Sequence, residues 1–140
     1  MVRVMDSAAP RLKTKSVGII GAGISGISCA KTLTQAGFIV ELFDKGRNLS
    51  GRMATRGNDG SDFDHGAQYF TATHPEFKKE VAKWVNAGVA QLWTPDIYVF
   101  GDKQSTKNTD DVERFVGVPN MTTPAKFVSM GLSINLNTTI

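Results

Sequence analysis

The chain has 140 residues, of which 41% are hydrophobic and 21% are charged. This composition is typical of a folded globular protein and excludes intrinsic disorder. The length fits one ordinary domain, and no apolar run approaches the roughly 20 residues that a membrane-spanning helix needs. The net charge of +3 comes from basic residues that are scattered along the chain, which argues against a nucleic-acid-binding surface.

The cysteine content and the first residues bear on the compartment. Cys29 is the only cysteine, which excludes an internal disulfide and favours a reducing compartment, so the cytoplasm is the expected location. Residues 1–15 are basic and contain no apolar core of a secretory signal. We expect a disordered lead-in there, and an organellar location, for example the chloroplast, is the alternative.

A strand, a tight turn, a helix and a second strand are predicted between Val17 and Asp44. The apolar run 17–20 predicts a buried strand, and the helical spacing over 24–35 predicts a helix that Gly37 would end. The apolar segment 38–43 predicts the second strand. Two strands joined by a crossover helix run parallel. We therefore predict an α/β fold with a Rossmann-like FAD/NAD(P)-binding βαβ unit.

The elements predicted after Asp44 are shorter. Residues 47–62 are polar and glycine-rich, which predicts a loop. Thr73 is the expected cap of a helix whose apolar positions recur every three or four residues up to Gly88. The remaining predictions are strands at 69–71, 91–93, 97–100 and 132–136, a polar loop at 101–111 and a short helix at 123–130.

Glycine is concentrated in the first half of the chain, where ten of the fourteen glycines lie within residues 18–66. This segment contains the motif Gly21-x-Gly23-x-x-Gly26 between the predicted strand and helix, which is the context that a dinucleotide-binding fingerprint requires. Gly21 would permit the tight turn, Gly23 the approach of a pyrophosphate, and Gly26 the close packing of helix and strand. The candidate pyrophosphate-binding residues are Gly21, Ala22, Gly23, Ile24, Ser25 and Gly26. A glycine-rich turn without a ligand is the alternative.

Asp44 forms the second part of this fingerprint. It lies 23 residues after Gly21, at the end of the second predicted strand. An acidic residue at about this distance is expected to accept hydrogen bonds from the ribose hydroxyls of the adenosine half. Its charge disfavours a 2′-phosphate, and an aspartate that only shapes the turn is the alternative. The two features predict a dinucleotide but do not distinguish FAD from NAD.

Two later segments carry a resemblance to a known family. The stretches GRMATR (51–56) and FDHGAQYFT (63–71) resemble the renalase-like branch of the FAD-dependent amine oxidoreductases. Residues 114–121, RFVGVPNM, are similar to a GVPGM segment of that branch. The resemblance extends from about Val17 to the end of the chain and implies a noncovalently bound FAD. It is more specific than the glycine motif alone.

The resemblance also implies roles for individual residues. Lys45 would lie near the adenosine end, and Arg52 would bind FAD phosphates, which suits a guanidinium that bonds two oxygens at once. The branch usually has two glycines before this arginine, whereas this chain has Ser50 and Gly51; serine fits there if its φ is negative. The residues implied to contact the cofactor beyond the fingerprint are Lys45, Gly51, Arg52 and Met53 on the phosphate side and Gly66, Ala67, Gln68 and Tyr69 beside the flavin.

The implied function is that of an oxidoreductase in which an amine or a dihydronicotinamide-type compound gives a hydride to FAD. Members of the branch are more than twice as long. We therefore expect an FAD-binding Rossmann-like portion at 16–72 and the start of a mixed α+β substrate or cap region at 73–140, apparently truncated. Whether the chain is a complete enzyme stays open.

The expected partner is a small-molecule substrate, with no nucleic acid and no membrane span. The sequence predicts neither a metal site nor a catalytic side chain, and it gives no oligomeric state. Two alternatives to the oxidoreductase remain. One is a truncated non-catalytic fragment that binds a dinucleotide or only a partner, and the other is an NAD-dependent dehydrogenase.

Overall fold

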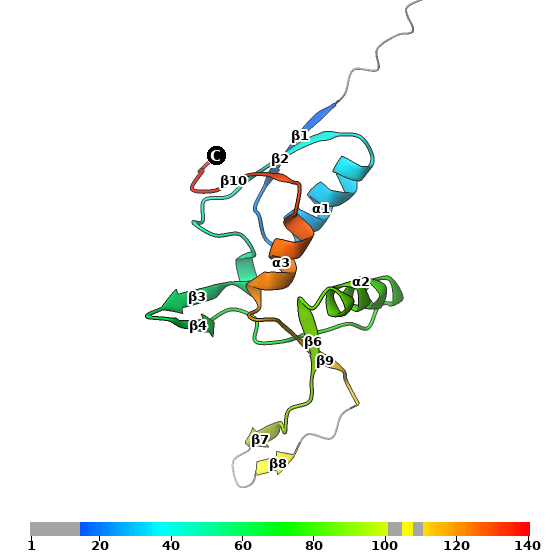
Figure 1. Ribbon diagram of the computed structural model, residues 1–140, viewed down its shortest axis with the longest axis vertical. Helices are drawn as coiled ribbons and strands as arrows, with labels where there is room; N and C mark the ends of the chain where they lie inside the picture. The colour runs from blue at the N-terminus through cyan, green and yellow to red at the C-terminus, as the bar shows by residue number, and fades with distance from the viewer. Residues whose placement is uncertain (1–14, 101–104, 108–110) are drawn as a thin grey trace, which may run out of the picture.

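The computed structural model describes residues 15–100, 105–107 and 111–140 (Figure 1). Most of the predicted lead-in, residues 1–14, lies outside these described residues, as does most of the predicted loop 101–111. Among the helices of the described part, none is long and apolar enough to cross a membrane. The same part of the chain contains no group of three or more His, Cys, Asp or Glu side chains arranged to hold a metal ion.

The predicted βαβ unit is confirmed. Strand β1 (Ser16–Ile20) is followed by helix α1 (Ile24–Gln35) and strand β2 (Ile39–Phe43). The two strands pair in parallel, with Ser16 opposite Ile39 at one end and Ile20 opposite Phe43 at the other. Gly37 follows α1 at φ +87°, in the left-handed conformation that commonly ends a helix.

Two elements from the end of the chain pack on this unit. Helix α3 (Thr122–Ser129) contacts α1, and strand β10 (Ser133–Asn135) pairs in parallel with β2. The sheet order is therefore β1-β2-β10, and Figure 1 shows α3 and β10 beside the blue and cyan βαβ unit. The predicted division into residues 16–72 and 73–140 stays a prediction. Helix α3 and strand β10 belong to the second of these segments in sequence, but they pack on the βαβ unit of the first.

A second region is built around helix α2 (Pro75–Asn86). Strands β5 (Phe70–Thr71) and β6 (Ala90–Trp93) both pair antiparallel with the central strand β9 (Arg114–Gly117). The sequence did not predict β9 as a strand. The cap of α2 also differs from the prediction, because the His74 Nδ1 rather than the Thr73 hydroxyl accepts the Glu76 backbone N–H, at 3.3 Å.

Two hairpins include strands in segments that were predicted to be loops. Residues 47–62 contain the short 3₁₀ helix η1 (Gly51–Met53), β3 (Thr55–Asn58) and the start of β4 (Ser61–Asp64). Asp59 and Gly60 join the strands, both with positive φ, as a two-residue hairpin turn requires. The segment lacks the apolar alternation that predicts strands, which is why the prediction was wrong. Strand β7 (Tyr98–Phe100) confirms the strand predicted at 97–100, but its partner β8 (Ser105–Lys107) lies in the predicted loop 101–111.

One hydrophobic core joins the two regions. Its βαβ side consists of small and aliphatic side chains, and its α2 side is closed by Trp84, which is 3% exposed. The buried members of this core are Ala22, Ile27, Ala30, Val40, Leu42, Ala72, Val81, Trp84, Ala90, Ala125 and Val128. The shared core fixes the glycine motif relative to the segments that come later in the chain.

Candidate functional site

The glycine motif forms a tight turn between β1 and α1. Gly21 has φ +103°, which favours glycine, and no atom lies within 4 Å of the place where a side chain would begin. A Cβ atom on Gly26 would overlap the carbonyl oxygen of Gly21. The strand and the helix therefore approach each other more closely than any larger residue allows, as the sequence predicted.

The residues of α1 supply neither a side-chain cap nor a negative charge at the start of the helix. Gly23 caps the helix with extended backbone, no side chain accepts from the first N–H groups, and the first turn contains no acidic residue. The first N–H groups of a helix have no partner within it and give this end a partial positive charge. Such an end stabilises a bound phosphate.

Asp44 links the turn after β1 to the turn after β2. Its Oδ2 accepts the backbone N–H of Ala22, and its Oδ1 accepts the backbone N–H of Gly46, both at 2.7 Å. The carboxylate is thereby held at the carboxyl end of the parallel strands, beside the glycine motif. A carboxylate oxygen can accept more than one hydrogen bond, so Asp44 keeps capacity for hydroxyl donors.

The segment around η1 lies directly against the glycine motif. The Ser50 N–H donates to the Ala22 carbonyl oxygen at 2.8 Å, and Ser50 forms a parallel bridge with Gly23. A Cβ atom on Gly51 would come within 3.2 Å of the Gly23 Cα. Met53 is buried and Arg52 is exposed. The backbones of Gly23 and Gly51 thus meet at the start of α1, and Arg52 is the next residue of η1.

Ser50 adopts a backbone conformation that the sequence did not predict. The serine fits the pattern of the renalase-like branch if φ is negative, but φ is +98°. This left-handed conformation favours glycine and strains other residues. Ser50 is also 1% exposed, so surrounding contacts must hold it there.

The predicted flavin-side residues divide into two groups. The Ala67 N–H donates to the Arg52 carbonyl oxygen at 2.7 Å, and a Cβ atom on Gly66 would overlap that same oxygen. Gly66 and Ala67 therefore pack directly against the η1 backbone. Gln68 is exposed. Tyr69 packs elsewhere, with its ring centre 5.7 Å from that of Trp93 and under the Arg114 guanidinium.

A hollow of about 310 Å³ lies beside Asp44 and includes the predicted residue Lys45. Lys45 itself is exposed. One wall consists of Thr138, Thr139 and Ile140, which follow β10. No motif in the sequence marks these last residues, because they reach the site only through the pairing of β10 with β2.

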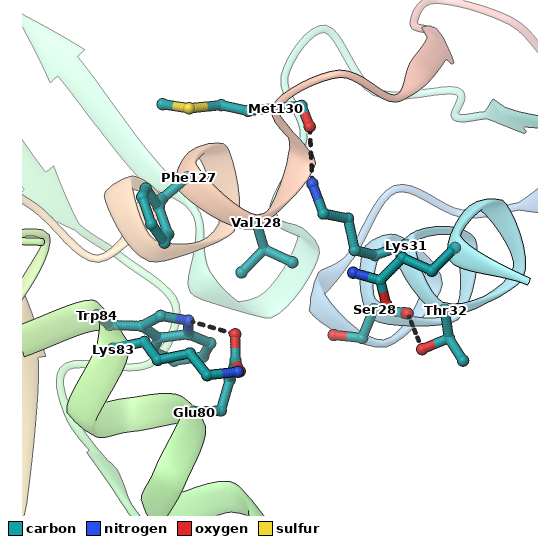
Figure 2. Close-up of a pocket in the computed structure, with 10 residues that line it drawn as sticks. Ser28, Lys31, Thr32, Glu80, Lys83, Trp84, Phe127, Val128 and Met130 are labelled. Atoms are coloured by element: carbon teal, nitrogen blue, oxygen red, sulfur yellow. Dashed lines mark hydrogen bonds and ion pairs between the residues drawn. The ribbon is translucent and has the colours of Figure 1, made fainter.

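A second hollow, of about 510 Å³, lies among α1, α2 and α3 and contains none of the predicted residues (Figure 2). Its polar groups pair with each other: the Lys31 ammonium donates to the Met130 carbonyl oxygen at 3.0 Å, and the Trp84 indole N–H donates to Glu80 at 3.2 Å. Glu80 also accepts a hydrogen bond from Lys83 and raises the pKa of that lysine. The glycine motif, rather than this hollow, therefore remains the candidate site.

Comparison with known proteins identifies the type of unit. Residues 19–85 match the family model of the NAD(P)-binding Rossmann-like domain. The βαβ unit of the chain is thus Rossmann-like in fold and similar to this domain. This range includes the glycine motif, Asp44, η1 and the segment 66–69, so the predicted fold class is confirmed.

A desaturase and an oxygenase are among the relatives that this chain resembles. Phytoene desaturase of Fusarium fujikuroi is 46% identical over 52 residues, which are 37% of this chain and 9% of the relative. The 4,4'-diaponeurosporene oxygenase of Staphylococcus haemolyticus is 38% identical over 60 residues, which are 43% of this chain and 12% of the relative. The matched segment thus spans about a tenth of these relatives.

Two solved structures share the fold. Putrescine oxidase bound to putrescine superposes with a TM-score of 0.50 and 24% identity, over 70% of this chain and 22% of the other. A mutant of 2-methyl-3-hydroxypyridine-5-carboxylic acid oxygenase gives a TM-score of 0.54 and 18% identity, over 89% of this chain and 32% of the other. At these identities the likeness concerns the fold.

Proposed function

We propose that this chain binds FAD noncovalently and forms the FAD-binding portion of a renalase-like, flavin-dependent oxidoreductase. The observation that carries the proposal is the contact of Gly51 and Ser50 with Gly23 and Ala22. It places the residue before Arg52 against the start of α1, whose first turn contains no acidic residue. The desaturase, oxygenase and oxidase names of the similar proteins support redox chemistry.

The residues present suit the parts of FAD. The amides at the start of α1 would bind the pyrophosphate, and the Arg52 guanidinium would bond two phosphate oxygens. Asp44 would accept hydrogen bonds from the adenosine ribose, with Lys45 near the adenosine end. Gly66 and Ala67 would pass beside the flavin, followed by Gln68 and Tyr69.

Bound FAD supplies the redox chemistry, since a flavin accepts a hydride from a substrate and passes the electrons to oxygen or another acceptor. The proposed substrates are amines or dihydronicotinamide-type compounds. This chain's own contribution is binding and orientation of the cofactor. The alternative is that these 140 residues bind the dinucleotide without catalysing a reaction.

NAD(P) binding is the second candidate, because the matched family model is named for it. The η1 segment argues for FAD, since Gly51, Arg52 and the 66–69 segment have no role in a plain NAD site. The Asp44 carboxylate further disfavours the 2′-phosphate of NADP, because two negative charges would meet at the ribose.

Titration calorimetry with FAD, NAD and NADP, together with the absorption spectrum of the purified chain, tests this proposal. We expect a yellow protein that releases flavin on denaturation. Arg52→Ala and Asp44→Ala should each weaken FAD binding by about 1–3 kcal/mol, the range for a lost charged hydrogen bond. Arg56→Ala is the matched control, because Arg56 is exposed on β3 and has no assigned role.

A protein that stays colourless after incubation with FAD would refute the proposed cofactor, and binding of NAD alone would favour the dehydrogenase. Unchanged FAD affinity in both variants would refute the assigned residues. Oxygen consumption with amines and reduced nicotinamides then tests turnover. FAD binding without any turnover would support the non-catalytic alternative.

A further inference from the structure

A buried threonine at the start of α3 contacts both ends of η1. Thr122 is 5% exposed, and its Oγ1 lies 3.2 Å from the Met53 carbonyl oxygen and 3.4 Å from the Ser50 Oγ. The Thr55 backbone N–H donates to the same Oγ1 at 2.9 Å. One side chain thus contacts the residue before η1, its last residue and the first residue of β3.

A carboxylate fixes the direction of one neighbouring hydrogen bond. An ionised Asp64 can only accept, so the Thr55 hydroxyl donates to its Oδ1, at 2.6 Å. The Thr55 Oγ1 is then free to accept the Thr122 backbone N–H, at 3.2 Å. The Thr122 hydroxyl hydrogen has two acceptors within reach, the Thr55 Oγ1 at 3.0 Å and the Met53 carbonyl oxygen at 3.2 Å. Its oxygen accepts the Thr55 backbone N–H and lies 3.4 Å from the Ser50 Oγ.

The η1 segment needs external support. It has three residues, too few for a 3₁₀ helix to persist by itself, and Ser50 before it has the strained φ of +98°. One face is tied to the glycine motif through the Ser50 N–H and the Ala22 carbonyl oxygen. On the buried side, Thr122 contacts Ser50 and Met53.

We propose that Thr122 is a positioning residue of the dinucleotide site: its hydroxyl holds η1 against the start of α1 and so places Gly51 and Arg52 for the phosphates. This inference rests on the proposed function. It makes cofactor affinity depend on a side chain that lies 70 residues after Arg52 in the sequence and belongs to another element.

Substitution of the hydroxyl by a methyl group tests the proposal in the full chain. Thr122→Val keeps the shape of the side chain but leaves the Met53 carbonyl, the Thr55 N–H and the Ser50 hydroxyl without this partner. We expect FAD affinity to fall about tenfold, because unsatisfied buried groups favour rearrangement of η1. Thr122→Ser, which retains the hydroxyl, should restore it.

Thr123→Val is the matched control. Its hydroxyl is on the same turn of α3 but bonds to the Asn120 Oδ1, at 3.1 Å, and FAD affinity should not change. If Thr122 only stabilises the fold, Thr122→Val would lower the melting temperature and leave FAD affinity at the wild-type value, which would overturn the proposal. If Thr122→Val fails to fold, Thr55→Val is the second variant, because it removes the half-buried hydroxyl that bonds to Thr122. It should weaken FAD binding, and unchanged FAD affinity in Thr55→Val would count against the proposal.

Two further measurements separate this inference from the proposed function. In the protein without cofactor, amide hydrogen exchange at 51–55 should accelerate in Thr122→Val and not in Thr123→Val; equal exchange would refute positioning. If the wild type binds no FAD, the proposed function fails and the exchange result alone decides the role of Thr122. If the wild type binds FAD, Thr122→Val should reduce FAD affinity less in an Arg52→Ala background than in the wild type. If the effects of the two substitutions on the free energy of FAD binding were fully additive, Thr122 would not act through η1.

Discussion

The two sides of the shared core are built by different means. In the βαβ region the close approaches are between backbones, as where Gly26 meets Gly21 and where Gly51 meets Gly23. The α2 region adds ring packing: Phe70 lies against Phe77, Trp84 and Phe115, with centroids 5.7–6.2 Å apart. A close backbone approach also occurs there, because a Cβ atom on Gly117 would overlap the Asn120 carbonyl oxygen. Removing a ring leaves a cavity whose cost grows with its volume, whereas a close backbone contact leaves no room for one added methyl group.

The two regions also begin their helices differently. Helix α2 starts with the His74 cap, Pro75 and Glu76, so its positive end is satisfied by its own residues. Helix α1 starts at Gly23 with neither a side-chain cap nor an acid. The start of α2 is thus satisfied by its own residues, whereas the start of α1 is where the proposed phosphate site lies.

The largest effect is expected in the ring-packed region. Trp84→Ala should lower the free energy of unfolding by about 3–5 kcal/mol, because it removes a nearly fully buried ring and leaves a cavity. Trp93→Ala is the matched control, since Trp93 is 38% exposed and should cost much less. Chemical denaturation of both variants measures the difference. Equal losses would show that burial does not govern this region.

A single methyl group should have a comparable effect in the βαβ region. Ala is normally favoured over Gly inside a helix by about 1 kcal/mol, but a Cβ on Gly26 overlaps a backbone oxygen that cannot move freely. We expect Gly26→Ala to lose about 3 kcal/mol. In Gly18→Ala the new Cβ meets only the Phe43 ring edge, at 3.6 Å, and stability should be kept. Thermal unfolding checks both, and a stable Gly26→Ala would contradict the backbone comparison.

The βαβ unit was predictable because its signals are local. The apolar run of β1, the spacing of α1 and the position of Gly37 each lie within a few residues of the structure that they determine. The same holds for the glycine motif and Asp44, since their spacing along the chain reflects one crossover unit. The fold class therefore follows from the sequence, and the assignment of these residues to a cofactor stays a prediction.

What the sequence could not predict depends on long-range pairing. Strand β9 is short, and its strand character comes from two partners that lie upstream in the chain. The contact of Thr122 with Met53 joins residues 69 positions apart, and a lone threonine carries no motif. The left-handed Ser50 was missed because a serine there gives no local indication of positive φ, and neighbouring contacts hold it.

The smallest effect on stability tests the contrast between the two helix starts. Ser25→Asp places an acid in the first turn of α1, where Ser25 is exposed. The dipole interaction should raise the stability of the cofactor-free protein by about 0.5 kcal/mol, and salt near 1 M should remove the gain.

The same substitution should weaken FAD binding, because the carboxylate repels the pyrophosphate and competes for the same amides. Glu76→Gln on α2 is the opposite control: it should slightly destabilise the protein, since Glu76 interacts with the helix start and with Lys79, at 2.7 Å, and leave FAD affinity unchanged. Unfolding curves at low and high salt, measured beside FAD titrations, separate the two helices. If Ser25→Asp gained stability and bound FAD as tightly as the wild type, the start of α1 would not be the phosphate site.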